Sequence, residues 1–438
     1  MKVLFGMIYA PDKGGSGAPI YTDNLMKGLV ARGDQAGIVT SVHHSYKPSA
    51  DLTYKVYPLY FDNPPIFDNQ PQAIGSIPFK DMTKKQAQEY IKAFYAEFER
   101  LSQQDYYDLI HVQHGMYIGY AASLIKAKYR VPYFVSLHAM ELNFLEDFQD
   151  PIFAMKAMTD ADKILALSQS QKDRLLSEYT KKRIIEIDMR QNGFSWIESE
   201  ARYKNIIGNR EIEPDNVVIC PLGIDTSHYN IRKYDFKKDF AKISSINNSK
   251  VVMYAGRLIE MKGIKNLLEA EKIYNKKDDV QTIVLGGGEL ASYVENIART
   301  RKNVKYLGYK EQKEMPFYLN FIAEYGGVFT VPSSSEGMSL VYLEAMACGA
   351  RVLASCKKDM SEMDFMQTPF ARFTTFGNIE ELAATITDML SEKPLTRKII
   401  RHNMKKYNLS NFKKRVFDLY EEYCSPREET LQNQASFL

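Results

Sequence analysis

The stretch from Val331 to Ser355 constrains the fold more than any other part of this 438-residue chain. It opens where a buried strand ends, because Pro332 and three serines follow apolar and β-branched residues. Helix-forming residues then run from Leu340 to Cys348, Gly349 closes the helix, and a second buried strand starts at Arg351. A strand, loop, helix and strand in this order are typical of an α/β fold with parallel sheets.

Two carboxylates flank the loop and helix of this stretch. Glu336 precedes the helix, and Glu344 lies about one turn inside it. Between them, the backbone N–H groups of Gly337, Met338 and Ser339 lack helical partners at the positive end of the helix. This arrangement predicts a phosphate site with an acid on each side, one for sugar hydroxyls and one for ribose hydroxyls. The alternative is a solvated Glu336 and a Glu344 on a surface helix.

The same stretch resembles a known family signature. Seven residues separate the two acids, and Ala-Met-Ala-Cys-Gly follows, which resembles the E-x7-E signature of retaining GT-B glycosyltransferases of the GT4 family, or glycosyltransferase group 1. The resemblance extends over nearly the whole chain. It implies two Rossmann-like α/β domains with parallel sheets facing across a cleft. The donor would bind mainly to the second domain and the acceptor mainly to the first.

Arg257 and Lys262 are expected at a strand end and a helix start. A bidentate arginine and a lysine point charge suit a diphosphate. They match the family's G-R-x4-K-G motif, which implies that both cations stabilise the leaving diphosphate during catalysis. Two solvated surface cations are the alternative. The resemblance also implies a set of donor-binding residues: Gly256, Gly287, Tyr309, Gly337, Met338, Ser339, Leu340 and Glu344.

A glycine-rich loop follows the first expected strand and contains Gly15, Ser16 and Gly17. A dinucleotide fingerprint needs a third glycine where Ile20 stands, and the next strand ends without an acid for ribose, so NAD binding is rejected. The three loop residues instead predict close backbone approach to a ligand. The resemblance places them near the donor phosphate and the acceptor, and a tight turn without a ligand is the alternative.

His138 ends an expected strand, at the edge where open parallel sheets bind ligands. The run VSLHAMEL resembles the family's T-x-H-G-x-D/E segment, which implies that His138 is catalytic and touches the transferred sugar. Glu141 stands where the family often has Asp, so its match is the weaker one. His111 and His114 are alternatives for the histidine role.

The expected domain boundaries follow changes in composition. We expect an N-terminal acceptor-side domain over 1–225, a linker over 226–249 and a C-terminal nucleotide-sugar-binding domain over 250–407. A helix over 408–424 would return to the first domain, and residues 425–438 would form a disordered tail.

Three segments carry no clear motif. Residues 46–82, rich in proline and aromatic residues, are expected to form a long loop that shapes the acceptor site. Residues 177–213 resemble an insertion with some helix and include Trp196, the only tryptophan, but no role follows. Beyond Ser355 the family's Gly-Gly-x-x-E is replaced by CKKDMSEMD, in which Glu362 is the candidate acid.

The net charge and the cysteine content limit the binding partners and the cell compartment that we expect. A net charge of +3 gives no basis for nucleic-acid binding, although basic clusters at 84–85 and 181–183 leave a peripheral contact with the inner face of a membrane open. Four cysteines without metal-ligand spacing favour reduced thiols in the cytoplasm. Asp160 and Asp162 match a DxD pattern but are expected to cap a turn, so neither a metal nor a cofactor is predicted.

Taken together with these patterns, the family resemblance implies a metal-independent glycosyltransferase. It would move a sugar from a UDP- or GDP-sugar, with retention of configuration, to a sugar, a lipid-linked molecule or another small molecule. No residue presents itself as a nucleophile, so the resemblance implies front-face attack assisted by the leaving phosphate. The alternatives are an epimerase or a phosphorylase of the same fold, and a non-catalytic subunit that binds a partner or carrier.

Overall fold

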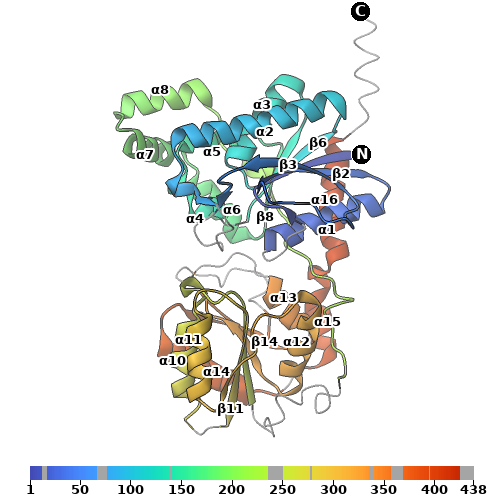
Figure 1. The fold of residues 1–438 in the computed structure, drawn as a ribbon, viewed down its shortest axis with the longest axis vertical. Helices are drawn as coiled ribbons and strands as arrows, with labels where there is room; N and C mark the ends of the chain where they lie inside the picture. Colours follow the sequence, from blue (N-terminus) through green and yellow to red (C-terminus); the bar gives the residue numbers. More distant parts are fainter. Residues whose placement is uncertain are drawn as a thin grey trace, which may run out of the picture. The chain divides into compact units, whose positions relative to one another are not determined.

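The computed structural model describes residues 1–11, 17–66, 76–138, 140–234, 250–276, 279–334, 340–356, 368–393 and 395–424. They form two compact units. Unit 1 combines Met1–Pro221 with the chain from Lys413 onward, and unit 2 comprises Leu222–Phe412. Each unit contains one parallel sheet with helices packed on it (Figure 1).

Unit 1 is built on a seven-stranded sheet in which every neighbouring pair is parallel. The central strands are buried on both faces, which explains their continuous apolar runs. The chain reverses its direction of strand addition between β1 and β6, which is where such sheets bind ligands. Across the sheet the strands are β3 (Lys55–Phe61), β2 (Gln35–His43), β1 (Lys2–Met7), β6 (Leu109–Gln113), β7 (Tyr133–Ser136), β8 (Lys163–Ala166) and β9 (Val217–Ile219).

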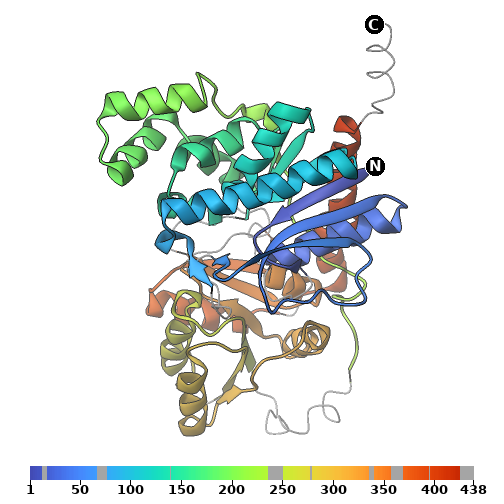
Figure 2. The same cartoon turned by 45° about the horizontal axis from the view of Figure 1, so that its top comes forward.

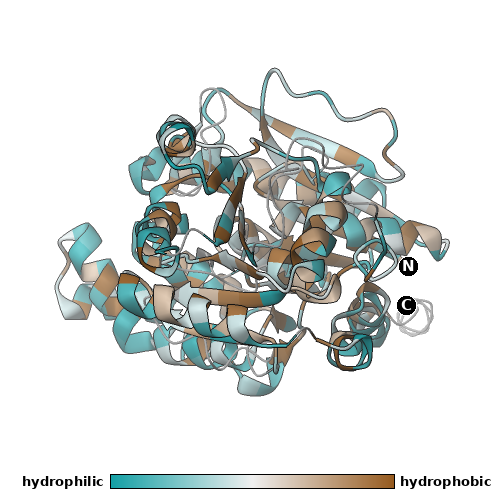
Figure 3. Ribbon diagram, turned by 90° about the horizontal axis from the view of Figure 1, so that it is seen from below, coloured by the Kyte–Doolittle hydropathy of each residue, from teal (hydrophilic) through white to brown (hydrophobic). Residues whose placement is uncertain are grey.

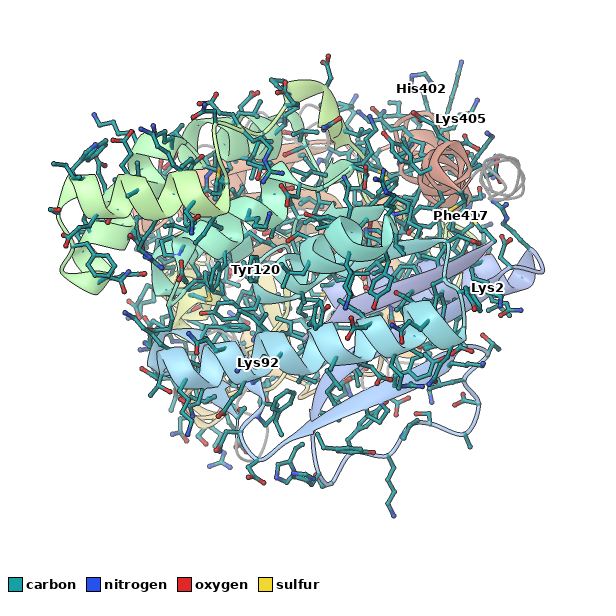
Figure 4. All side chains as sticks on the ribbon, turned by 90° about the horizontal axis from the view of Figure 1, so that it is seen from above. Lys2, Lys92, Tyr120, His402, Lys405 and Phe417 are labelled. Atoms are coloured by element: carbon teal, nitrogen blue, oxygen red, sulfur yellow. The ribbon has the colours of Figure 1, made fainter. Side chains whose placement is uncertain are left out.

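Helices pack against the sheet of unit 1, and Figure 3 shows helices of the protein along which teal and brown residues alternate. The longest, α2 (Lys84–Gln104), starts at a capping box in which Thr83 and Gln86 satisfy each other's backbone N–H groups. It buries one aromatic face while Lys92 lies exposed on the other (Figure 4). The other helices are α1 (Gly17–Ala31), α3 (Tyr117–Tyr129), α4 (Met140–Asn143), α5 (Pro151–Thr159), α6 (Gln169–Glu178), α7 (Lys181–Asn192) and α8 (Trp196–Ile206). The last helix, α16 (Leu409–Tyr423), begins in unit 2 and belongs to unit 1 from Lys413 onward.

The segment 46–82 is not the continuous loop that its composition predicts. It contains β3, which pairs with β2 along its whole length, and the short strands β4 (Pro65–Ile66) and β5 (Ile77–Pro78). Pro58 lies within β3, and proline is tolerated there because β3 is the edge strand of the sheet. Because of its prolines, the sequence of this segment does not indicate the edge strand that the structure contains.

Unit 2 contains a six-stranded parallel sheet with the same kind of strand order. Its direction reverses between β10 and β13, and both strands are buried along nearly their whole length. The strands, in spatial order, are β12 (Val304–Tyr306), β11 (Val280–Leu285), β10 (Lys250–Ala255), β13 (Val328–Val331), β14 (Arg351–Cys356) and β15 (Ala371–Thr375). The helices are α10 (Ile264–Tyr274), α11 (Ala291–Thr300), α12 (Met315–Glu324), α13 (Leu340–Ala347), α14 (Ile379–Ser391) and α15 (Arg397–Met404).

Two contacts define where the chain passes between the units. The backbone of Ile224 is hydrogen-bonded to Tyr407 and Leu409, so the segment after Pro221 is tied to unit 2. Where the chain returns to unit 1 after Phe412, the side chain of Arg415 donates to the carbonyl of Pro221 at 2.9 Å. None of the described helices has the length and apolar content needed to cross a bilayer.

Candidate functional site

In unit 2, the loops after β10 and β11 are joined by backbone hydrogen bonds. Leu258 N–H donates to the carbonyl of Gly287 at 2.8 Å, which fixes the backbone on either side of Arg257. Gly286 has φ 135°, and a Cβ there would lie 1.9 Å from the carbonyl oxygen of Gly256. Only glycine allows this approach. The glycine triplet therefore shapes the strand end that carries Arg257.

Lys262 lies at the end of a short 3-10 turn, Glu260–Lys262, just before α10. Gly263 follows with φ 68°, and a Cβ there would meet the carbonyl oxygen of Pro332 at 1.9 Å. Ser334 N–H also donates to the carbonyl of Met261 at 2.8 Å. The G-R-x4-K-G loop is thus fastened to the connection between β13 and α13, which is the connection that carries the first acid of the E-x7-E motif.

Some predicted site residues lie outside the described part of the chain, so their roles stay predictions. They are Gly15, Ser16, Glu336, Gly337, Met338 and Ser339, and the candidate acid Glu362 lies there too. Of the neighbouring predictions, Gly17 opens α1 and Leu340 opens α13.

Glu344 lies in α13 with only 7 % of its surface exposed. Burial raises the pKa of its carboxyl group to about 7, against the opposing effect of hydrogen bonds from Tyr229 and Gln312. Neither partner was predicted from the sequence. Tyr229 lies in the expected linker over 226–249 and Gln312 lies shortly after Tyr309, so only proximity to predicted segments could have indicated them.

The loop after β12 carries Tyr309, whose side chain is 73 % exposed. The preceding Gly308 accepts a hydrogen bond from Gly286 N–H at 2.9 Å, and Tyr306 donates to the carbonyl of Gly286 at 2.9 Å. Three loops at the carboxyl edge of the sheet, after β10, β11 and β12, are therefore linked in series. Such an edge suits a nucleotide whose base is held by backbone groups and whose phosphates face Arg257 and Lys262.

In unit 1, His138 lies directly beyond β7 and is held by the neighbouring strand. Gln113 is paired in register with Ser136, and its Oε1 lies 2.9 Å from Nε2 of His138. Tyr21 of α1 packs edge-on against the imidazole, with ring centroids 5.2 Å apart. Burial, with a smaller effect of His114, lowers the pKa of His138 to about 3. The ring is thus neutral, and with Nε2–H donating to Gln113 its Nδ1 can accept a hydrogen bond from a hydroxyl group.

Glu141 and His114 form a buried pair beside this histidine. Nδ1 of His114 lies 2.9 Å from Oε1 of Glu141, and the other carboxylate oxygen accepts from the backbone N–H of His138 at 3.1 Å. Burial raises the pKa of Glu141, but His114 and the hydrogen bonds outweigh it, so the pKa lies below its usual value. Glu141 has no exposed surface, and its contacts position the segment that carries His138.

His111, the other alternative, is fully buried in the sheet. Its Nε2 lies 2.8 Å from Oγ of Ser136, which in turn lies 2.8 Å from the hydroxyl of Tyr21. Its Nδ1 is hydrogen-bonded to Tyr420 of α16. These contacts use both ring nitrogens, so His111 connects α16 to the core and His138 is the histidine at the strand edge.

The DxD pair is engaged in structural contacts. Asp162 accepts from the backbone N–H of Tyr133 at 2.9 Å and pairs with Lys126 at 2.8 Å, while Asp160 pairs with Lys156 at 2.6 Å. In the part of the chain that the structure describes, no three His, Cys, Asp or Glu side chains cluster as a metal site would require.

The fold and the two family matches define the class of this protein. Two units with parallel sheets of this strand order are the architecture of GT-B enzymes. The family model described as Glycosyltransferase Family 4 matches residues 15–187, and the model described as Glycosyl transferases group 1 matches residues 235–408. The chain belongs to the group 1, GT4-type glycosyltransferases, which confirms the family and the fold predicted from the sequence.

Individual relatives are distant. The chain is 26% identical over 274 residues to the putative teichuronic acid biosynthesis glycosyltransferase TuaC of Bacillus subtilis, covering 62% of this chain and 59% of TuaC. It is 23% identical over 413 residues to an uncharacterized glycosyltransferase of Methanocaldococcus jannaschii, covering 93% of both.

Solved structures resemble the chain over nearly its whole length. HepE of Anabaena, solved with UDP, has a TM-score of 0.65 at 17% identity, covering 96% of this chain and all of HepE. Sucrose-phosphate synthase of Thermosynechococcus elongatus has a TM-score of 0.69 at 16% identity, covering 96% and 98%. At these identities the likeness establishes the fold.

Proposed function

We propose that this glycosyltransferase uses a nucleoside diphosphate sugar, with UDP or GDP as the carrier, and transfers a hexose with retention of configuration and without a metal. The observation that carries the proposal is the fastening of the Arg257–Lys262 loop to the β13–α13 connection through Gly263 and Ser334. Two cations beside a helix start suit a diphosphate leaving group. The structural neighbour HepE was solved with UDP and with UDP-glucose, which supports a uridine donor.

In this proposal Arg257 and Lys262 neutralise the negative charge that grows on the diphosphate as the glycosidic bond breaks. Glu344 accepts hydrogen bonds from ribose hydroxyls, and Glu336 from the hydroxyls of the transferred sugar. His138 touches that sugar and, as a neutral imidazole, accepts a hydrogen bond from a hydroxyl group. The leaving phosphate helps to take the proton of the acceptor.

For the acceptor we propose only a class of molecule: a sugar, a lipid-linked molecule or another small molecule. A cytoplasmic location agrees with Cys220 and Cys348, which are buried free thiols. A peripheral contact with the inner face of a membrane fits the same proposal, since a lipid-linked acceptor would lie there.

Thermal unfolding with UDP, GDP, ADP and CMP, each with and without EDTA, tests the donor. A nucleotide at 100 times its dissociation constant should add about 2.7 kcal/mol to the free energy of unfolding. We expect one diphosphate to stabilise the protein selectively and equally in EDTA. Loss of the effect in EDTA would contradict metal independence, and no response to any nucleotide would favour a non-catalytic subunit.

The stereochemistry needs a separate measurement. Once the donor is known, the anomeric configuration of the first product formed can be read by NMR. Retention supports the proposal, inversion refutes the retaining assignment, and a change of sugar configuration without transfer would instead indicate an epimerase.

A further inference from the structure

The turn between α7 and α8 presents apolar side chains to solvent. In Figures 1, 2 and 4 this turn projects away from the rest of unit 1. Ile197 is 78 % exposed, the highest fraction among the exposed large hydrophobic residues that the structure describes, and the neighbouring Trp196 is 40 % exposed. Phe194 is half-buried beside them. We call Phe194, Trp196 and Ile197 the hairpin tip.

The backbone of the tip is held in a defined conformation. Gly193 ends α7 in the left-handed region, with φ 67°, and its N–H donates to the carbonyl of Met189 at 2.9 Å. Ser195 begins α8 through a capping box, in which Glu198 accepts from the Ser195 N–H at 2.7 Å. The exposure of Trp196 and Ile197 is therefore fixed by two helix caps and does not reflect a loose loop.

The hairpin does not need an apolar tip for its own stability. Its helices bury a different set of residues, among them Ile184, Ile185 and Ile187 of α7 and Tyr203 of α8. Single exposed apolar side chains are ordinary, whereas adjacent ones that form a continuous patch mark interaction surfaces. The tip is therefore a candidate contact site.

The chemistry around the tip favours a lipid surface. Tryptophan is enriched where hydrocarbon meets headgroups, because its ring is apolar and its indole N–H can donate a hydrogen bond. The hairpin Lys181–Ile206 carries six lysine and arginine residues against four acids. Lys182 and Arg190 are well exposed, and their ion pairs with Glu186 and Glu146 are exposed too, so water and salt weaken them. Cations of this kind are attracted to anionic headgroups. Three apolar side chains are too few for a stable protein interface, which buries about 800 Å² on each partner.

We propose that the hairpin tip inserts into the headgroup region of an anionic lipid bilayer and holds unit 1 at the membrane surface. This inference rests on the membrane contact in the proposed function and names the residues that make it. Membrane binding requires no catalytic turnover. The vesicle test can therefore fail while the nucleotide-binding test succeeds, and the nucleotide-binding test can fail while the vesicle test succeeds.

Trp196 is the only tryptophan, so its fluorescence reports on the tip directly. The full chain is titrated with vesicles of phosphatidylcholine, with and without phosphatidylglycerol. Insertion should shift the emission to shorter wavelength, more strongly with the anionic lipid and less at high salt. No shift with either vesicle overturns the proposal.

Ile197→Asn removes the most exposed apolar side chain without disturbing the core. It should weaken vesicle binding roughly ten- to hundredfold. The matched control is Ile399→Asn in α15, because Ile399 is 38 % exposed and lies next to Lys398 in a basic helix. If Ile399→Asn weakens binding and Ile197→Asn does not, the membrane surface is α15 and the proposal is wrong.

Discussion

Gln113 holds His138 from the neighbouring strand, with 2.9 Å between Oε1 of the amide and Nε2 of the imidazole. Gln113 and Ser136 are the last residues of β6 and β7 and are paired with each other. His138, two residues beyond the end of β7, therefore lies beside Gln113. The amide therefore fixes both the orientation and the tautomer of the ring.

Replacing His138 or Gln113 should lower transfer without abolishing donor binding. We expect His138→Ala to reduce kcat about a hundredfold, and Gln113→Leu somewhat less, because a misoriented group loses most of its catalytic effect. Donor affinity, measured by thermal unfolding with the diphosphate, should stay near that of the wild type. His402→Ala, at an exposed position in α15, is the control. Full turnover in His138→Ala would remove this histidine from the mechanism.

Replacing Glu141 should destabilise unit 1 and change its response to acid. Since the pKa of Glu141 is lowered in the folded state, its ionised form stabilises the fold above the unfolded-state pKa near 4.5, and this contribution is lost as the pH falls. Glu141→Gln keeps one acceptor oxygen for the two groups that the carboxylate contacts, His114 and the backbone N–H of His138, and should cost about 1–3 kcal/mol in the free energy of unfolding at neutral pH. Denaturant unfolding at several pH values measures both effects. The exposed Glu146→Gln should change stability by less than about 0.5 kcal/mol.

Removing either cation of the diphosphate site should weaken nucleotide binding. Each charge-assisted hydrogen bond contributes about 1.5–3 kcal/mol, so Arg257→Ala or Lys262→Ala should raise the dissociation constant of the preferred diphosphate at least tenfold. Isothermal titration calorimetry measures it. Lys265→Ala is the matched control, since Lys265 lies in the adjoining helix and pairs with Glu260 at 2.6 Å. Equal losses in all three variants would indicate a general charge effect.

Donor binding should strengthen as the pH rises through about 7. Because the folded-state pKa of Glu344 is about 7, its carboxyl group is protonated below that pH and ionised above it. An ionised carboxylate accepts hydrogen bonds from ribose hydroxyl groups more strongly than a protonated one. The same raised pKa means that Glu344 contributes less to folding stability as the pH rises from 4.5 to 7. Glu344→Gln should bind more weakly and lose this pH dependence, and an unchanged profile would contradict the ribose role.

Much of the fold could be predicted from local patterns. The helix expected from Leu340 to Cys348 is α13, which ends one residue earlier, and the strand expected to start at Arg351 is β14. The edge strand β3 was missed because Pro58 opposes a strand assignment everywhere except at an edge. Whether a strand lies at an edge is a property of the assembled sheet.

Some residues of the candidate site could likewise be predicted from the sequence, and others could not. The motifs of Arg257 and Lys262 could be located because their spacing is local and chemically specific. Gln113, Tyr229 and Gln312 could not, since each acts on a residue that lies 25, 115 or 32 positions away in the sequence. A hydrogen bond between distant residues leaves no periodic signal in either segment.

The sequence by itself determined the α/β class, the family and the positions of its motifs, because strands, helices and glycine turns are specified by neighbouring residues. Only the tertiary structure decided that Gln113 holds His138, why the pKa of Glu344 approaches neutrality, and that Trp196 and Ile197 face solvent. Burial depends on what packs around a side chain, and that environment is assembled from residues far apart along the chain.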